Sequence, residues 1–197
     1  MIGCSSTTPS PVVTVDQLDN DLVGYIPEIS TTVILPPGYT LRENLEEPNR
    51  RGTFAAYWFD QVTNEDPLDA SQRVFPYFAE IQLFTDESIR DFEQYCEELA
   101  TEHPEVACFY GDFPSLERYN SQREAFYAIQ DYENFVLRKF EEEYYFVSTH
   151  WCEGHMCAVR EYTTFIDQIK VDVLILMSDP SQSEKSDELF RNFRLDQ

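Results

Sequence analysis

Basic residues are scarce in this chain, and only Lys139, Lys170 and Lys185 are lysines. The 197 residues include 14 Lys and Arg against 37 Asp and Glu, which gives a formal net charge of −23. A surface of this sign repels phosphate backbones and anionic headgroups, so nucleic acid is excluded as a direct partner. The acids are spread along the whole chain, which favours a role in surface hydration over a docking site for a basic partner or for divalent cations.

Long apolar runs and catalytic glycine motifs are also absent. No run reaches about 18 apolar residues, so no helix is expected to span a membrane. The six glycines form neither a phosphate-binding loop nor a Gly-x-Ser-x-Gly elbow. Only His103, His150 and His155 offer a histidine base, and among 37 acids no single catalytic carboxylate pair stands out. The sequence therefore identifies no catalytic residue and no cofactor site.

The apolar composition indicates a folded, sheet-rich domain. Hydrophobic residues make up 42% of the chain and aromatic residues 15%, with 15 Phe and 12 Tyr. This length and apolar content are enough for one domain with a core of its own. The abundance of aromatic and β-branched residues favours strands.

The first residues carry a lipid-attachment pattern. Ile2-Gly3-Cys4 resembles the end of a bacterial lipoprotein signal, in which the cysteine carries the lipid. Residues 5–22 are rich in Ser, Thr, Pro and acids, which is typical of a flexible tether. The sequence thus predicts a tether over residues 1–24 and one domain over 25–197. The resemblance implies an exported protein of the cell envelope, attached to a membrane by the lipid on Cys4.

Periodicity and turn residues predict the elements of the domain. Helical spacing indicates helices over 86–101, with Thr85 or Asp86 as N-cap, and over 183–193; residues 115–131 are compatible with helix or strand. Strands are predicted over 30–35, 53–59, 77–84, 135–140, 144–150, 158–166 and 169–177. The order predicts an α+β domain in which helices pack on an antiparallel sheet.

Two short patterns resemble the PsbP/Mog1-like α/β/α sandwich. The first is the turn Leu35-Pro36-Pro37-Gly38-Tyr39 after an early strand. The second is the last strand followed by a helix that reads Asp187-Glu188-Leu189-Phe190-Arg191-Asn192-Phe193. The resemblance spans residues 25–197 and implies a non-enzymatic binding or assembly module. It assigns no functional residue.

Four cysteines remain besides Cys4, an even number that can pair in an oxidising compartment. Cys152 and Cys157 flank a predicted hairpin loop, so a disulfide between them is favoured over a metal site built from His150, Cys152, His155 and Cys157. Cys96 and Cys108 lie twelve residues apart, and we expect them to form the second disulfide, with no metal bound.

The aromatic residues exceed what one sheet face needs. Alternation along strands sends some of them to the other face, which is either covered by a second layer or forms a protein-binding patch. A covered sheet is the favoured interpretation. The sequence as a whole favours a non-catalytic, membrane-tethered binding module, whose partner presents a basic or apolar face. A carboxylate-dependent hydrolase is the alternative. The aromatic residues that exceed the needs of one sheet face are Tyr57, Trp58, Phe59, Tyr77, Phe78, Tyr144, Tyr145 and Trp151.

Overall fold

The computed structural model describes residues 22–44, 52–61, 74–103, 114–125, 135–152 and 156–196, to which every structural statement below refers. In chain order the strands are β1 (Leu22–Ile26), β2 (Thr31–Leu35), β3 (Tyr39–Glu43), β4 (Ala55–Gln61), β5 (Tyr77–Phe84), β6 (Val136–Phe140), β7 (Glu143–Trp151), β8 (Ala158–Ile166), β9 (Ile169–Met177) and β10 (Arg194–Asp196). The helices are α1 (Asp86–Glu102), α2 (Leu116–Glu124) and α3 (Ser183–Phe190), with short 3-10 helices η1 (Pro27–Ile29) and η6 (Pro180–Gln182).

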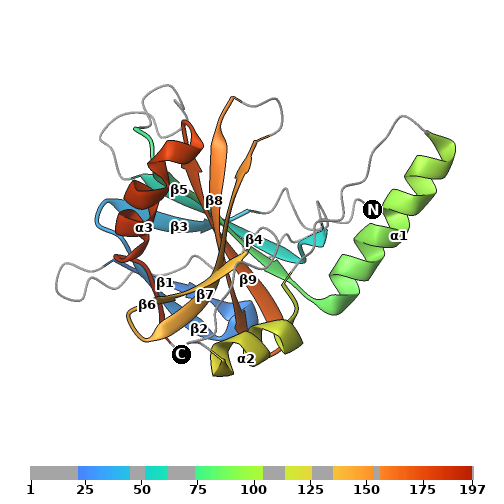
Figure 1. The fold of residues 1–197 in the computed structure, drawn as a ribbon, viewed down its shortest axis with the longest axis horizontal. Helices are drawn as coiled ribbons and strands as arrows, with labels where there is room; N and C mark the ends of the chain where they lie inside the picture. Colours follow the sequence, from blue (N-terminus) through green and yellow to red (C-terminus); the bar gives the residue numbers. More distant parts are fainter. Residues whose placement is uncertain are drawn as a thin grey trace, which may run out of the picture.

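The strands form two antiparallel sheets (Figure 1). The large sheet has the order β3-β4-β5-β9-β8-β7-β6, and the small sheet has the order β1-β2-β10. The predicted α+β class with an antiparallel sheet is therefore confirmed.

Strands β6 to β9 form a meander whose turns suit the twist of a sheet. The β6–β7 turn begins at Glu141 with φ 51°, and the β8–β9 turn begins at Asp167 with φ 56°. Positive φ in such tight turns matches the right-handed twist of the paired strands. At the end of the meander, the first half of β9 is buried on both faces at Lys170–Val173, whereas Leu174 and Leu176 in its apolar second half are half-buried.

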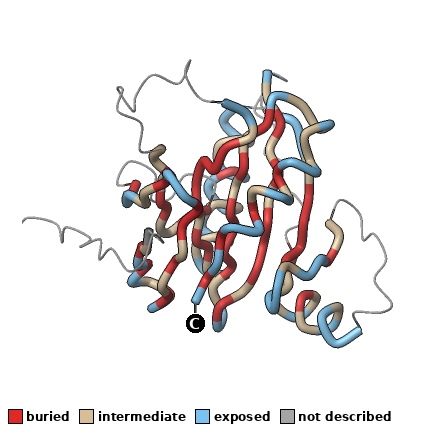
Figure 2. Tube along the Cα trace, turned by 90° about the vertical axis from the view of Figure 1, so that its left-hand side faces the viewer, coloured by how far each residue is buried: buried red, intermediate tan, exposed pale blue. Residues whose placement is uncertain are grey.

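One face of the large sheet carries the main hydrophobic core, which α3 and the small sheet cover. The ring of Phe190 on α3 stacks on Tyr162 of β8, with centroids 3.8 Å apart and planes inclined by 2°. Phe193 follows α3 and contacts Phe78 of β5. Figure 2 shows the buried residues running along the strands, with exposed residues at turns and helix surfaces. The closing segment of the chain is thus anchored by aromatic packing.

The small sheet packs closely against strand β3. A Cβ atom at Gly24 of β1 would lie 3.2 Å from Leu41 Cδ2 of β3, so a larger side chain there would push the two strands apart. Leu195 of β10 is buried in the same core. This packing places β10 beside the turn between β6 and β7.

Helix α1 begins at the predicted N-cap and extends away from the sheets (Figure 1). The hydroxyl of Thr85 accepts a hydrogen bond from Ser88 N, and Ser88 Oγ accepts one from Thr85 N, which forms a reciprocal cap. Cys96 is the buried residue of this helix. No helix in the described part of the chain is long and apolar enough to cross a membrane.

Three short strands depart from the sequence prediction. Strand β1 includes residues 22–24, which were assigned to the tether, and β3 follows a turn that was expected to end the first strand. The last predicted helix stops at Phe190, and β10 forms after it because it pairs with β2. Within the ambiguous segment, Leu116–Glu124 is helical, with Ser115 as its N-cap.

Candidate functional site

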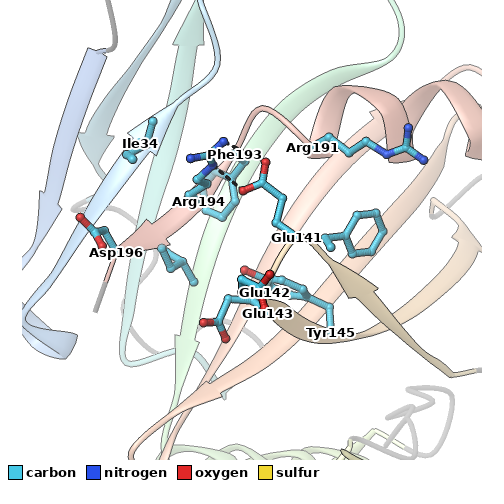
Figure 3. Close-up of a pocket in the computed structure, with 11 residues that line it drawn as sticks. Ile34, Glu141, Glu142, Glu143, Tyr145, Arg191, Phe193, Arg194 and Asp196 are labelled. Carbon is cyan, nitrogen blue, oxygen red and sulfur yellow. Dashed lines mark hydrogen bonds and ion pairs between the residues drawn. The ribbon is translucent and has the colours of Figure 1, made fainter. Parts of the chain in front are cut away.

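A cavity of about 300 Å³ lies between β10 and the turn that joins β6 to β7 (Figure 3). Its apolar residues are buried or half-buried, and its charged residues are exposed. The apolar lining consists of Ile34, Phe140, Tyr145, Phe193 and Leu195, and the charged lining of Glu141, Glu142, Glu143, Arg191, Arg194 and Asp196. We call this cavity the acidic pocket. Its volume is at the lower end of the range for small-molecule sites.

The β6–β7 turn is held to β10 by one ion pair. Arg194 Nη2 donates a hydrogen bond to Glu141 Oε1 at 2.8 Å, and Arg194 Nε lies 2.8 Å from Glu141 Oε2. This two-point contact crosses the pocket in Figure 3. Glu141 also has the left-handed backbone conformation, which is unfavourable for a residue other than glycine. The ion pair therefore fixes a strained turn beside the cavity.

Besides its ion pairs, this pocket has two carboxylates, Glu143 and Asp196, against one guanidinium group, that of Arg191, so its remaining charge is about −1. Glu141 is neutralised by Arg194, and Glu142 lies 3.2 Å from the ammonium group of Lys139. Glu143 and Asp196 form no ion pair with any residue that the structure describes. Burial, and next the Glu143 carboxylate, raise the pKa of Tyr145 far above its usual value, so its phenol stays neutral. The arrangement suits a cationic group attached to an apolar body.

A second cluster of polar groups is buried on the opposite face of the large sheet, where Tyr119 of α2 packs on Phe146. Lys170 and Asp172 of β9 form a close ion pair, and Lys170 Nζ lies 4.0 Å from Glu161 Oε1 of β8. The Thr163 hydroxyl donates to Asp172 Oδ1 at 2.6 Å and lies 3.3 Å from Glu161 Oε1.

One ammonium group in this cluster faces two carboxyl groups, Glu161 and Asp172. Burial, and next the Asp172 carboxylate, raise the pKa of Glu161 to about 7, although Lys170 opposes the shift. A protonated Glu161 leaves the cluster electrically neutral. We call this group of residues the buried carboxyl cluster. No residue of the buried carboxyl cluster lines the acidic pocket.

The cysteine-rich segment lies at one end of the large sheet. Cys152 and Cys157 form a disulfide with their Cα atoms 5.2 Å apart, and Cys152 N donates a hydrogen bond to Cys157 O. A sulfur atom in a disulfide is not a thiolate ligand, so this geometry does not provide the alternative metal site. His150 is instead directed at the carboxyl cluster, with Nδ1 3.9 Å from Glu161 Oε2.

Three of the predicted site residues lie outside the described residues. Cys96 is buried on α1, whereas its proposed partner Cys108 lies outside the described residues, as do Cys4 and His155. Among the described residues, no group of three or more His, Cys, Asp or Glu is arranged to hold a metal ion.

The aromatic surplus is largely accounted for by burial in the main hydrophobic core. Of the eight aromatic residues considered, five are buried and two are half-buried, whereas Trp151 is 45% exposed. The buried ones are Tyr57, Phe59, Tyr77, Phe78 and Tyr145, and the half-buried ones are Trp58 and Tyr144. These strands therefore do not form the broad aromatic binding patch that was the other interpretation.

Comparison with protein-family models, with curated proteins and with solved structures finds no match to this chain. The acidic pocket was not recognised from the sequence. Its only local signal is Glu141-Glu142-Glu143, which reads as an ordinary solvated turn between two strands. The pairing of β10 with β2 creates the other wall.

Proposed function

We propose that this protein is a non-catalytic binding domain, held at a membrane surface by a lipid on Cys4. The acidic pocket is its binding site, and the partner is a protein that inserts a basic side chain with apolar neighbours. The observation that carries the proposal is the combination of an apolar lining with the carboxylates of Glu143 and Asp196, which outnumber the one guanidinium group without an ion pair, that of Arg191. A Lys or Arg side chain matches this combination, because an apolar stem carries its charge.

The sequence features are consistent with this proposal. The Ile2-Gly3-Cys4 pattern and the Ser/Thr/Pro-rich segment support attachment and export to the cell envelope. The antiparallel α+β architecture is compatible with a PsbP/Mog1-like sandwich, whose members act as binding or assembly modules. We propose this assignment as well, because the long strand β9 is followed by helix α3 and the Pro-Pro-Gly turn follows the early strand β2.

The test measures the affinity of the full chain for a panel of fluorescent peptides that place one Lys or Arg beside apolar residues. We expect Glu143→Gln and Asp196→Asn each to weaken the best peptide about three- to tenfold, because each removes a carboxylate from the rim. Added salt should also weaken the binding. Glu87→Gln on α1 is the matched control, since Glu87 is also exposed and lies outside the pocket. Unchanged affinity in both pocket variants would contradict the proposal.

The buried carboxyl cluster favours a second candidate, a carboxylate-dependent hydrolase. Glu161 has the raised pKa of a general acid, and Asp172 is a neighbouring carboxylate. Ser148 is opposite Glu161 in the sheet, and its hydroxyl is buried with no hydrogen-bond partner among the described residues. A glycosidase, esterase and phosphatase screen decides between the candidates. Turnover that Glu161→Gln abolishes and Glu87→Gln retains would replace the binding proposal with the hydrolase.

A further inference from the structure

A second cavity, of about 240 Å³, gathers positive charge in a chain that has little of it. Its lining consists of Arg138, Lys139, Phe140, Glu141, Asp187 and Arg191. We call it the basic pocket. It adjoins the acidic pocket, with which it shares Phe140, Glu141 and Arg191. Three of the 14 basic residues of the chain thus surround one small cavity, although the net charge is −23.

The two carboxylates of this pocket are already neutralised by arginines outside it. Asp187 Oδ1 and Oδ2 accept hydrogen bonds at 3.1 Å from Nε and Nη2 of Arg160, whose side chain is 9% exposed. Glu141 is held in the same two-point manner by Arg194. Each of these pairs has a net charge of zero. Therefore neither carboxylate offsets the cations that line the pocket.

The pocket cations are left with one exposed counter-charge. Arg138 adds a third cation-to-carboxylate contact to Asp187, with Nη1 3.0 Å from Oδ2. Lys139 pairs with Glu142, whose side chain is 92% exposed, so water screens this contact. The side chain of Arg191 forms no hydrogen bond or ion pair with the described residues, and Figure 3 shows it directed away from the Arg194–Glu141 pair. Three cations and one carboxylate leave a surplus of about two positive charges.

We infer that the basic pocket binds a phosphate monoester. Such a group carries about two negative charges at pH 7, which matches the surplus. Guanidinium groups donate parallel hydrogen bonds to phosphate oxygens, and Arg138 and Arg191 both have exposed side chains for this purpose. The acids elsewhere on the chain do not prevent binding at physiological salt, because their fields are screened beyond about 8 Å. The phosphate ligand is distinct from the basic partner proposed for the acidic pocket, although the two pockets share Phe140, Glu141 and Arg191.

The test is isothermal titration calorimetry of the full chain at 0.15 M salt with glycerol phosphate and with inorganic phosphate. Sedimentation with vesicles containing phosphatidic acid forms a third arm. Binding of glycerol phosphate identifies a soluble ester as the source, and binding to the vesicles alone identifies a lipid headgroup. Arg191→Gln removes a charge-assisted contact, so the affinity for whichever ligand binds should fall about ten- to hundredfold.

Two further variants make the result specific. Arg90→Gln removes an exposed arginine from α1, outside the pocket, and should bind like the original protein. Asp196→Asn changes only the acidic pocket and should not weaken phosphate binding, whereas it should weaken the basic peptides. The side chain of Arg191 has no partner among the described residues, so Arg191→Gln should fold normally, which circular dichroism verifies. Absence of binding in all three arms, or equal affinity in Arg191→Gln, would overturn the inference.

Discussion

The carboxylate of Asp187 on α3 is bound by the guanidinium group of Arg160 on β8 through two hydrogen bonds of 3.1 Å. The hydroxyl of Tyr162 donates a third bond to Asp187 Oδ1 at 2.8 Å. The pair is only slightly exposed, with 9% of the Arg160 side chain and 13% of the Asp187 side chain accessible. It therefore connects the closing helix to the sheet beside the basic pocket, which Asp187 lines.

Removing one partner of this pair should destabilise the fold. Asp187→Asn leaves the nearly buried Arg160 without a negative partner, so we expect the free energy of unfolding to fall by about 3 kcal/mol. Urea unfolding followed by circular dichroism measures the difference. Glu188→Gln is the control on the same helix, because Glu188 is exposed, and its effect should stay below about 0.5 kcal/mol. A loss below about 1 kcal/mol in Asp187→Asn would show that water replaces the pair at little cost.

The buried carboxyl cluster should make stability depend on pH. The pKa of Glu161 is raised from 4.5 to about 7 in the folded protein. Between these values the folded state holds a proton that the unfolded state releases, so stability is fully present below pH 4.5 and decreases as pH rises to 7. At about 1.4 kcal/mol per pKa unit, the total decrease is about 3 kcal/mol.

The variant Glu161→Gln isolates this effect from the other acids. Glutamine resembles the protonated carboxyl group, so we expect the variant to gain stability relative to the original protein as pH rises from 4.5 to 7. Urea unfolding at several pH values gives both curves. If the two proteins have parallel pH profiles, Glu161 does not titrate in this range. His150, Lys170 and Asp172 face the same carboxyl group and remain unchanged in the comparison.

The large sheet was predictable from sequence because its long strands carry strong signals. Strands β5, β8 and β9 have the predicted bounds, since each is a run of aromatic and β-branched residues closed by polar turn residues. The turn before β3 contains Pro36-Pro37-Gly38, which ends one strand without showing that another follows. Local patterns therefore identified the centre of the sheet better than its edge.

The pockets were not predictable for a different reason. Strand β10 has three residues, and Arg194 pairs with Ile34 near the other end of the chain. The sequence of such a short strand does not indicate which distant strand it joins. The acidic pocket depends on that pairing, and the basic pocket depends on the contact of α3 with β6 and β8. The charges that define both sites are spread over residues that no local motif connects.

The disulfide pairing can be tested directly by peptide mapping without reduction. We expect Cys152–Cys157, as in the structure, and Cys96–Cys108, whose second member lies outside the described residues. Four free thiols, or zinc in stoichiometric amount, would contradict both pairs. Replacing Cys152 and Cys157 together by Ala should lower the free energy of unfolding by about 2 kcal/mol, the chain-entropy value for a short loop.

Lipid attachment at Cys4 should determine where the protein is found in the cell. When the natural gene is expressed with its upstream DNA, metabolic labelling with a fatty-acid analogue should mark the protein and fractionation should place it with the membrane. Cys4→Ser should abolish the label and release the protein, because the lipid on Cys4 is the proposed anchor. Cys152→Ser should retain the label, since it removes a cysteine outside the signal-like pattern. An unlabelled natural protein, or a stop codon close upstream of Met1, would refute the tether and with it the predicted oxidising compartment for the disulfides.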